Sequence, residues 1–238
     1  MNSRKKKILV LCPYPVNCAP SQRLKFEQYY DYFEENGYEV NVSSFVTPKF
    51  WQILYKKGYF VFKAYYTFIG YFIRFKDLFR LRQYDIVYIH LWVTPLGPPL
   101  FERIVRLLSK KIIYDIDDMI FLGHSSDANS MILAIKGKKK INYLIKKSNY
   151  VITGAPAMEQ YCSKINRKVK DIPPTIDYKK FPLKKDYSLR STLVLGYSGS
   201  HSTLKYLKSI EPVFNELLNL GISFKVLLIT NADFSFDN

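Results

Sequence analysis

Ile8-Leu9-Val10-Leu11-Cys12 is a continuous apolar run that follows a basic stretch and ends at Pro13. An uninterrupted apolar run of this length is typical of a strand buried on both faces, as in a parallel sheet. Ser21 is placed to cap a helix over 23–36 that ends at Gly37, and a second strand pattern follows. This strand–helix–strand order predicts a right-handed parallel crossover.

Strand and helix patterns alternate over the next part of the chain. We expect strands over 38–45, 85–90, 111–116, 149–153 and 169–172, and helices over 99–108, 135–147 and 157–165. Strands that alternate with helices predict an α/β, Rossmann-like doubly wound parallel sheet domain.

The pattern breaks at Pro173-Pro174, and charged residues and turn formers follow. A new unit then begins, with a strand over 192–197, a Ser198-Gly199-Ser200 turn, a helix over 204–220 and a strand over 224–230. We therefore expect three parts: a first domain over 1–174, a linker over 175–191, and a second Rossmann-like domain over 192–238. This second part is shorter than the roughly 50 residues that a domain usually needs, so we expect it to be incomplete.

The composition is that of a globular protein, because 48% of the 238 residues are hydrophobic and 24% are charged. The net charge of +16 favours an anionic partner, which is a phosphate, a nucleic acid or an acidic membrane surface. The three cysteines have no metal-ligand spacing and the sequence shows no secretory signal, so we expect a cytoplasmic protein.

The stretch 51–82 is crowded with Tyr and Phe, and Asp77 is its only acidic residue. On a helix, one narrow polar face would hold Lys56, Lys63, Thr67 and Arg74. The apolar run is shorter than the roughly 20 residues that a membrane-spanning helix needs. The segment is either an interfacial amphipathic element or a helical pair that covers the sheet.

Several segments together resemble family 4 glycosyltransferases. The segment from Lys168 to Asp177, followed by Phe181, resembles their interdomain segment. Asn149–Thr153, followed by a helix with Glu159 and Tyr161, is similar to the strand–helix unit before it. Leu195-Gly196-Tyr197-Ser198-Gly199-Ser200 resembles the opening of their nucleotide-binding domain, and Pro13-x-Pro15 with Ser21-Gln22-Arg23 is similar to their first loop.

The resemblance implies a GT-B fold and retaining transfer of a sugar from a nucleoside-diphosphate donor. Two features depart from the family. Its signature pair of glutamates, which hold donor sugar and ribose, has no counterpart up to Asn238, and the first loop lacks the usual glycine pair. The resemblance therefore implies that this chain is truncated and inactive alone, and that acceptor contacts cannot be copied across.

An acidic cluster closes the strand over 111–116. Asp115 and Asp117 lie on one face of that strand, and Asp118 follows. In many relatives a histidine near this position faces the transferred sugar, so the resemblance implies a catalytic role for these carboxylates. They could hold sugar hydroxyls or offset positive charge at the anomeric carbon. The alternatives are a helix cap at Asp118 or a Mg²⁺ site, although the fold class works without a bound metal.

The other candidates are polar groups at strand ends and helix starts. The turn after the strand over 192–197 is either a phosphate-binding loop or an ordinary tight turn, and its donor-binding candidates are Gly196, Ser198, Gly199, Ser200 and His201. Candidate acceptor or phosphate contacts, each with a packing or surface role as the alternative, are Ser21, Arg23, His90 and His124.

We therefore expect a metal-independent hexosyltransferase-type enzyme in cell-surface polysaccharide or glycan synthesis. Its substrates would be a nucleotide sugar and a saccharide or lipid-linked acceptor, with no cofactor. It would be cytoplasmic and peripheral on an anionic membrane. The rival is a non-catalytic acceptor- or membrane-docking module. A nucleic-acid partner is not expected, because no recognition motif is present.

Overall fold

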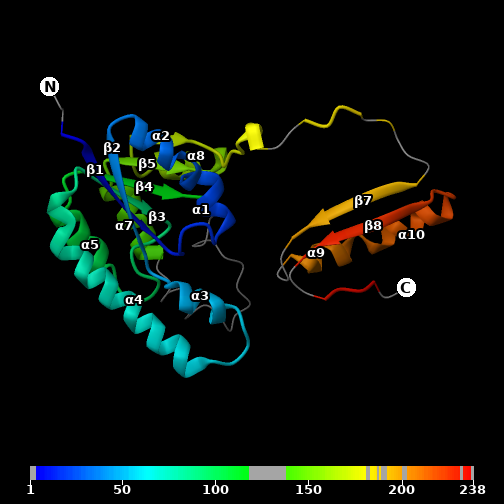
Figure 1. Ribbon diagram of the computed structural model, residues 1–238, viewed down its shortest axis with the longest axis horizontal. Helices are drawn as coiled ribbons and strands as arrows, with labels where there is room; N and C mark the ends of the chain where they lie inside the picture. The colour runs from blue at the N-terminus through cyan, green and yellow to red at the C-terminus, as the bar shows by residue number, and fades with distance from the viewer. Residues whose placement is uncertain are drawn as a thin grey trace. The chain divides into compact units, whose positions relative to one another are not determined.

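The computed structural model describes residues 4–117, 138–180, 183–186, 188, 192–199, 203–230 and 233–236. The chain divides into two compact units, Met1–Asp177 and Tyr178–Asn238. Each unit is built on its own parallel sheet, and the colours in Figure 1 follow the chain from the first sheet to the second.

The first unit contains a six-stranded sheet in the order β2-β1-β3-β4-β5-β6, and all neighbouring pairs are parallel. Its strands are β1 (Lys6–Cys12), β2 (Tyr38–Ser44), β3 (Ile86–His90), β4 (Ile112–Ile116), β5 (Tyr150–Thr153) and β6 (Val169–Asp171). They confirm the strands expected from the sequence. The order reverses at β1, which pairs with β2 on one side and β3 on the other. Ligands of open parallel sheets bind at the carboxyl edge beside such a reversal.

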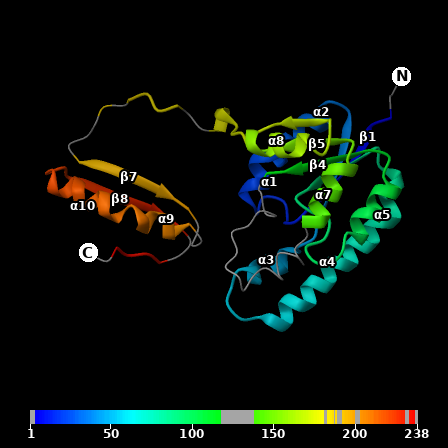
Figure 2. The same cartoon turned by 180° about the vertical axis from the view of Figure 1, so that it is seen from behind.

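Helices pack on both faces of this sheet (Figures 1 and 2). One face is covered by α5 (Leu100–Leu108), α7 (Lys138–Lys147) and α8 (Pro156–Ser163). There Leu9 and Tyr114 belong to the same buried cluster as Ile145 of α7. On the other face, Ile8 and Val10 pack against Phe26. The apolar run of β1 is continuous because this strand contributes to the core on both sides.

The helix expected over 23–36 is divided in the structure. It consists of α1 (Pro20–Lys25), the 3-10 turn η1 (Glu27–Tyr29) and α2 (Tyr30–Glu35). The expected cap at Ser21 is wrong, because Ala19 is the N-cap and Pro20 begins the helix. The helix is interrupted at Phe26, whose side chain is only 4% exposed. Gly37, with φ of +81°, ends the segment as expected.

The aromatic stretch forms two helices, α3 (Pro48–Leu54) and α4 (Phe60–Arg80), and the short turn η2 (Leu81–Gln83). Figures 1 and 2 show α4 in cyan along the border of the first unit. Three members of the predicted polar face point toward the core, since Arg74 is buried and Lys63 and Thr67 are half-buried. The fourth, Lys56, is exposed and precedes α4. Among the described helices, none combines the length and apolarity that crossing a bilayer requires.

The second unit begins with η4 (Tyr178–Lys180) and contains β7 (Leu193–Ser198), α9 (Leu204–Ser209), α10 (Glu211–Asn219) and β8 (Phe224–Ile229). β7 and β8 are parallel neighbours. The helix expected over 204–220 is interrupted at Ile210, and Pro212 occupies the first turn of α10. Burial alternates along both strands, so that Val194, Leu227 and Ile229 lie on an exposed sheet face.

Candidate functional site

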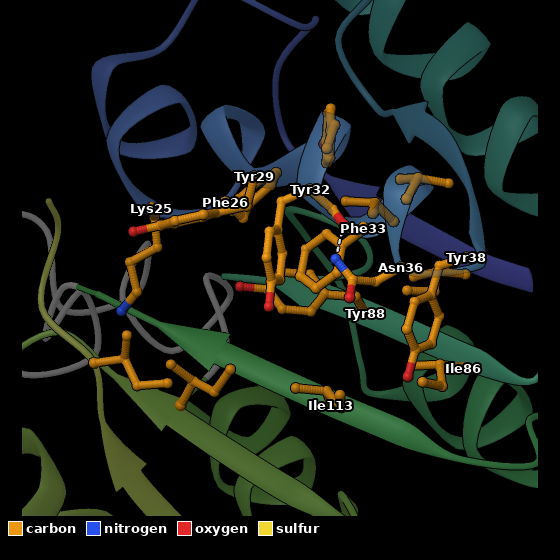
Figure 3. A pocket seen from close by; sticks show the side chains of 16 residues that line it. Lys25, Phe26, Tyr29, Tyr32, Phe33, Asn36, Tyr38, Ile86, Tyr88 and Ile113 are labelled. Carbon is orange, nitrogen blue, oxygen red and sulfur yellow. Dashed lines mark hydrogen bonds between the residues drawn. The ribbon is translucent and has the colours of Figure 1, made fainter. Parts of the chain in front are cut away.

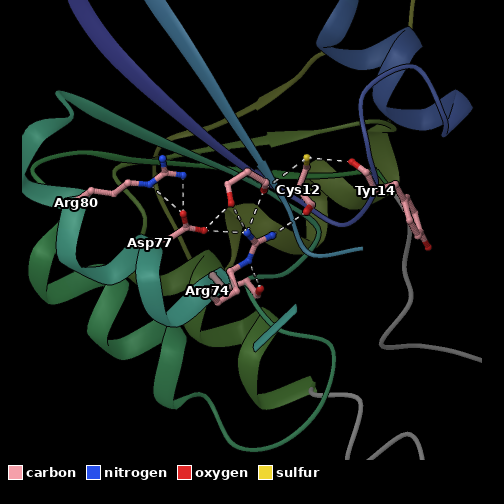
Figure 4. Close-up of polar contacts among 7 residues, drawn as sticks. Cys12, Tyr14, Arg74, Asp77 and Arg80 are labelled. Atoms are coloured by element: carbon pink, nitrogen blue, oxygen red, sulfur yellow. Dashed lines mark hydrogen bonds and ion pairs between the residues drawn. The ribbon is translucent and has the colours of Figure 1, made fainter. Parts of the chain in front are cut away.

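The carboxyl ends of β1 and β2 and the segment after β3 are joined by one buried side chain, Arg74 of α4 (Figure 4). Its Nε donates to the carbonyl of Val93 at 2.8 Å, and its Nη2 donates to the carbonyl of Cys12 at 2.8 Å. Its Nη1 donates to both the carbonyl and the hydroxyl of Ser43, at 3.0 and 2.9 Å. This guanidinium therefore fixes the edge of the sheet at the point where the strand order reverses.

Asp77 balances the charge of this cluster. Its Oδ2 accepts from Arg74 Nη1 at 3.1 Å and from the Ser43 hydroxyl at 2.6 Å, while its Oδ1 pairs with Arg80 at 2.6 Å. Burial lowers the pKa of Arg74, and the charge of Asp77 acts against that shift. Nearby, burial raises the pKa of the Cys12 thiol to about 12, so this cysteine is not an activated nucleophile.

A second buried cluster lies where β3 and β4 end. His90 and Asp115 are register neighbours on these parallel strands. His90 Nδ1 lies 2.9 Å from Asp115 Oδ2, and both side chains are 0% exposed. The imidazole also packs edge-on against the ring of Phe26, with 5.0 Å between the centroids. The carboxylate and the aromatic ring together fix the orientation of His90.

Lys25 of α1 completes this cluster from another element. Its Nζ lies 3.0 Å from Asp115 Oδ1 and donates to the carbonyl of Thr153 at 2.8 Å. Burial acts to raise the pKa of Asp115, but the hydrogen bond and charge of His90 and the charge of Lys25 lower it overall. Asp115 is therefore held as a carboxylate, and both of its oxygens face buried partners.

Asp117, which follows β4, is the more accessible of the two described acids. Its side chain is 10% exposed, and its Oδ2 lies 4.0 Å from His90 Nε2. Burial and the nearby Asp115 raise the pKa of Asp117, and His90 acts in the opposite direction. With Nδ1 held by Asp115, Nε2 is the ring nitrogen left to contact a ligand. Nε2 is buried and has no hydrogen-bond partner among the described groups.

Three contributors to this site were missed from the sequence: Lys25, Thr153 and Gly154. A Cβ at Gly154 would lie 3.2 Å from the Asp117 Cα and 3.4 Å from Lys25 Nζ, so the chain after β5 packs tightly against the cluster. The sequence signal for Lys25 was its spacing: Gln22 and Lys25 are polar residues three apart, which share one side of a helix, and the structure buries both.

The predicted contacts of the first loop lie differently from expectation. Ser21 is half-buried and Arg23 is exposed, whereas the residue between them is fully buried. The Gln22 side chain accepts from the backbone N–H of Tyr14 at 2.9 Å and donates to the Tyr14 carbonyl at 2.9 Å. Gln22 therefore shapes the loop, and Arg23 remains accessible to an anion.

The structure brings His90, Asp115 and Asp117 together at one edge, as described above. Four other sequence candidates lie outside the described residues: Asp118, His124, Ser200 and His201. The remaining donor-binding candidates belong to the second unit. Gly196 and Ser198 are on its exposed sheet face.

Gly199 closes the end of β7. Its N–H donates to the carbonyl of Ile229 at 3.1 Å, so this amide is already used within the unit. A Cβ at this position would lie 2.5 Å from Thr203 Oγ1 and 2.6 Å from the Tyr197 hydroxyl. Close approach of these two side chains, rather than a free N–H, explains glycine here.

A cavity of about 540 Å³ lies between the α1–α2 segment and the sheet (Figure 3). Its walls are largely apolar and include Phe33, Tyr88 and Ile113. Lys25 borders it, but the amino group reaches out toward Asp115 and the carbonyl of Thr153. Apolar walls offer little to a polyhydroxylated ligand, so the polar cluster at the strand ends is the better candidate site.

No family model and no curated protein matches this sequence. The structure is similar to the catalytic domain of starch synthase IV from Arabidopsis thaliana bound to ADP and acarbose, with a TM-score of 0.56 and 13% identity over 96% of this chain and 69% of that chain. An α-glucosyltransferase in complex with UDP and DNA containing an HMU base gives a TM-score of 0.46, with 12% identity over 96% and 68%.

An α-glucosyltransferase in complex with UDP-glucose and DNA containing an abasic site gives a TM-score of 0.44, with 13% identity over 95% and 68% of the two chains. At these identities a likeness concerns the fold alone. The starch synthase domain matches nearly the whole chain, with parallel α/β architecture in common. This chain has the fold of the GT-B glycosyltransferases.

Proposed function

We propose that this protein is a nucleotide-sugar-dependent glycosyltransferase of family 4, which transfers a sugar with retention to a saccharide or lipid-linked acceptor. The observation that carries the proposal is the buried His90 Nε2, which has no hydrogen-bond partner among the described residues and lies beside Asp117 at the carboxyl edge of a GT-B-type parallel sheet. In open α/β sheets, this edge is where ligands bind.

Sugar transfer requires groups that hold hydroxyls and offset positive charge at the anomeric carbon. Asp117 is the partly exposed carboxyl of the site, so we assign it the contact with the transferred sugar. His90 Nε2 would form a hydrogen bond with a sugar hydroxyl. Asp115 and Lys25 are positioning residues, because one orients the imidazole and the other balances the charge of that carboxylate.

The donor diphosphate would bind the second unit at Ser198 and the turn that follows it. The support is the exposure of Ser198 and Gly196 on β7. Exposed Arg23 would contact a phosphate of donor or acceptor. In this proposal, cations and backbone dipoles stabilise the leaving diphosphate without a metal ion.

The test is release of nucleoside diphosphate from a panel of UDP-, ADP- and GDP-sugars, with saccharide and lipid-linked acceptors. The protein should be expressed from its complete reading frame. We expect Asp117→Asn and His90→Gln each to lower turnover at least tenfold, a loss on the order of 1.4 kcal/mol in transition-state stabilisation. NMR of the product would report whether the anomeric configuration is retained.

Asp31→Asn is the matched control, since Asp31 is an exposed acid on α2, away from the strand ends. It should leave turnover within twofold. Equal turnover in Asp117→Asn and Asp31→Asn would remove the cluster from the mechanism. If no nucleotide sugar binds, the rival of a non-catalytic acceptor- or membrane-docking module gains support.

A further inference from the structure

The outward side of α4 carries a row of large apolar side chains, which we call the aromatic seam. Alternating spacings of four and three residues place its members on one stripe of the helix. The seam consists of Val61, Tyr65, Phe68, Phe72, Phe75 and Phe79, which are 80%, 60%, 72%, 50%, 50% and 74% exposed. The amphipathic helix is therefore inverted, with its polar side packed against the protein.

Contacts on the inner side fix this orientation. Arg74 and Asp77 are buried in the hydrogen-bonded cluster at the sheet edge. Gly70 lies against Phe45, and a Cβ there would be 2.6 Å from the ring. A rotation of α4 about its axis that buried the seam would separate Arg74 from the backbone carbonyls to which it donates. It would also push larger side chains into Phe45. The exposure of the seam is therefore built into the packing of the helix.

The seam is too extended to be an incidental surface. It spans 18 residue steps on a helix that rises about 1.5 Å per residue, so it is roughly 27 Å long. Monomeric soluble proteins rarely expose contiguous apolar surface of this kind, and where it occurs it marks a protein or membrane contact.

The charges around the seam are almost all positive. Asp77 is the only acidic residue over 40–82, and it is buried between two arginines. Lys56 and Lys57 are exposed just before α4, and Lys76 is exposed on its carboxyl half. The Lys76 amine lies 4.7 Å from the centroid of the Phe72 ring, so the cation borders the aromatic surface.

We propose that the aromatic seam docks on an anionic lipid bilayer, with α4 lying flat in the headgroup region. Such helices insert an apolar face about 5–10 Å deep and keep cations at the headgroups, which fits the seam and its flanking lysines. A second copy of this chain is the less favoured occupant. It would bring the same cations face to face, in a protein whose net charge is +16.

Co-sedimentation of the whole chain with vesicles tests this proposal without reference to enzymatic activity. The probes are phosphatidylcholine vesicles with and without phosphatidylglycerol. We expect stronger partitioning to the anionic vesicles and only partial release by high salt, because salt screens the lysines but not the inserted rings. Phe68→Ser with Phe79→Ser should weaken partitioning at least tenfold.

The matched control is Leu107→Ser with Tyr206→Ser, which removes two exposed apolar side chains from elsewhere. It should partition as the wild type does. For the cations, Lys56→Gln with Lys57→Gln should weaken binding to anionic vesicles. The control pair Lys146→Gln with Lys147→Gln, two consecutive exposed lysines on α7, should weaken it less. Circular dichroism confirms that each variant is folded.

Four outcomes would overturn the proposal. They are no binding to either vesicle, equal binding to both, equal losses in seam and control variants, and a dimer that the seam variant dissociates without any vesicle binding. The last outcome would assign the seam to a second copy of the chain. If the protein binds anionic vesicles but releases no nucleoside diphosphate from any nucleotide sugar, the result would count against the proposed function alone.

Discussion

Two buried polar clusters lie at the same edge of the first sheet, and they differ in how fully their hydrogen bonds are made. The guanidinium of Arg74 has partners at Nε, Nη1 and Nη2, in three separate chain segments. Among the described residues, His90 has a partner at Nδ1 only, and its Nε2 is buried without one. A fully bonded cluster has a structural role, whereas an unpaired buried ring nitrogen beside a partly exposed acid is where a ligand can complete the bonding.

The acids of the second cluster repeat this contrast two residues apart. The His90 and Lys25 contacts lower the pKa of Asp115, whereas burial and the charge of Asp115 raise the pKa of Asp117. Carboxyl groups whose surroundings shift their pKa values in opposite directions are a common feature of acid–base sites. In this arrangement Asp115 is a fixed carboxylate with buried partners, and Asp117 is the more accessible of the two acids.

The largest expected effect comes from removing the centre of the fully bonded cluster. Arg74→Met leaves the carbonyls of Cys12 and Val93 without this donor, and Asp77 loses one of its two arginines. We expect the free energy of unfolding to fall by about 3–5 kcal/mol, as when one partner of a buried ion pair is removed. Urea denaturation followed by circular dichroism measures the change.

Arg82→Met provides the control, because Arg82 is an exposed arginine in the neighbouring turn η2. It should change the free energy of unfolding by no more than about 0.5 kcal/mol. A similar loss in both variants would mean that Arg74 contributes no more than a surface cation.

The strands and their order of appearance could be predicted from the sequence, because the core is built from short continuous apolar runs such as 8–12. The sequence did not predict which side of α4 faces the core. Periodicity placed Lys63, Thr67 and Arg74 on one side of the helix, but it did not show that this side faces the core. The choice depends on carbonyls from distant strands that only Arg74 reaches, and a local pattern does not report long-range hydrogen bonds.

The site was predicted in part for the same reason. Asp115, Asp117 and His90 end neighbouring strands, so strand order alone brings them together. Lys25 reaches them from the last position of α1, beside Phe26, where the helix breaks and the ring packs against the sheet and His90. A local pattern does not report these contacts with distant strands. Ser21 and Arg23 were selected because they stand at the amino end of the first expected helix, and that position does not report which side chains of the helix turn inward.

An intermediate effect is expected when the second cluster loses its cation. Lys25→Met leaves Asp115 with His90, and the carbonyl of Thr153 keeps its bond from the N–H of Ile172 at 3.0 Å. Because partners remain, we expect a smaller loss of about 1–3 kcal/mol in the free energy of unfolding. An equal loss of unfolding free energy in Lys25→Met and Arg74→Met would contradict the expected difference between the two clusters.

The pH dependence of Lys25→Met gives a second readout. The pKa of Asp115 is lowered in the folded protein, so its stabilising contribution is present above the unfolded pKa of about 3.9 and is lost as the pH falls through the folded value. Without Lys25 this pKa rises and the contribution shrinks. The difference between wild type and variant should therefore be largest near neutral pH and narrow below about pH 4. A difference that is constant with pH would separate Lys25 from the ionisation of Asp115.

The smallest effect on stability is expected at Asp117, and its sign is opposite. The folded protein raises the pKa of Asp117, so the ionised carboxylate is disfavoured by folding, and stability is lost as the pH rises from the unfolded pKa through the folded one. Asn cannot ionise, so Asp117→Asn should be slightly more stable than wild type at neutral pH, by on the order of 0.5 kcal/mol. This gain should vanish below about pH 3.9, where the wild-type carboxyl is protonated as well.

Urea denaturation at both pH values measures the gain in stability of Asp117→Asn, with Asp31→Asn as the exposed control. A variant that gains stability while losing turnover would identify Asp117 as a group retained for binding or chemistry. A variant that loses stability at neutral pH would show instead that the carboxylate makes a structural contact.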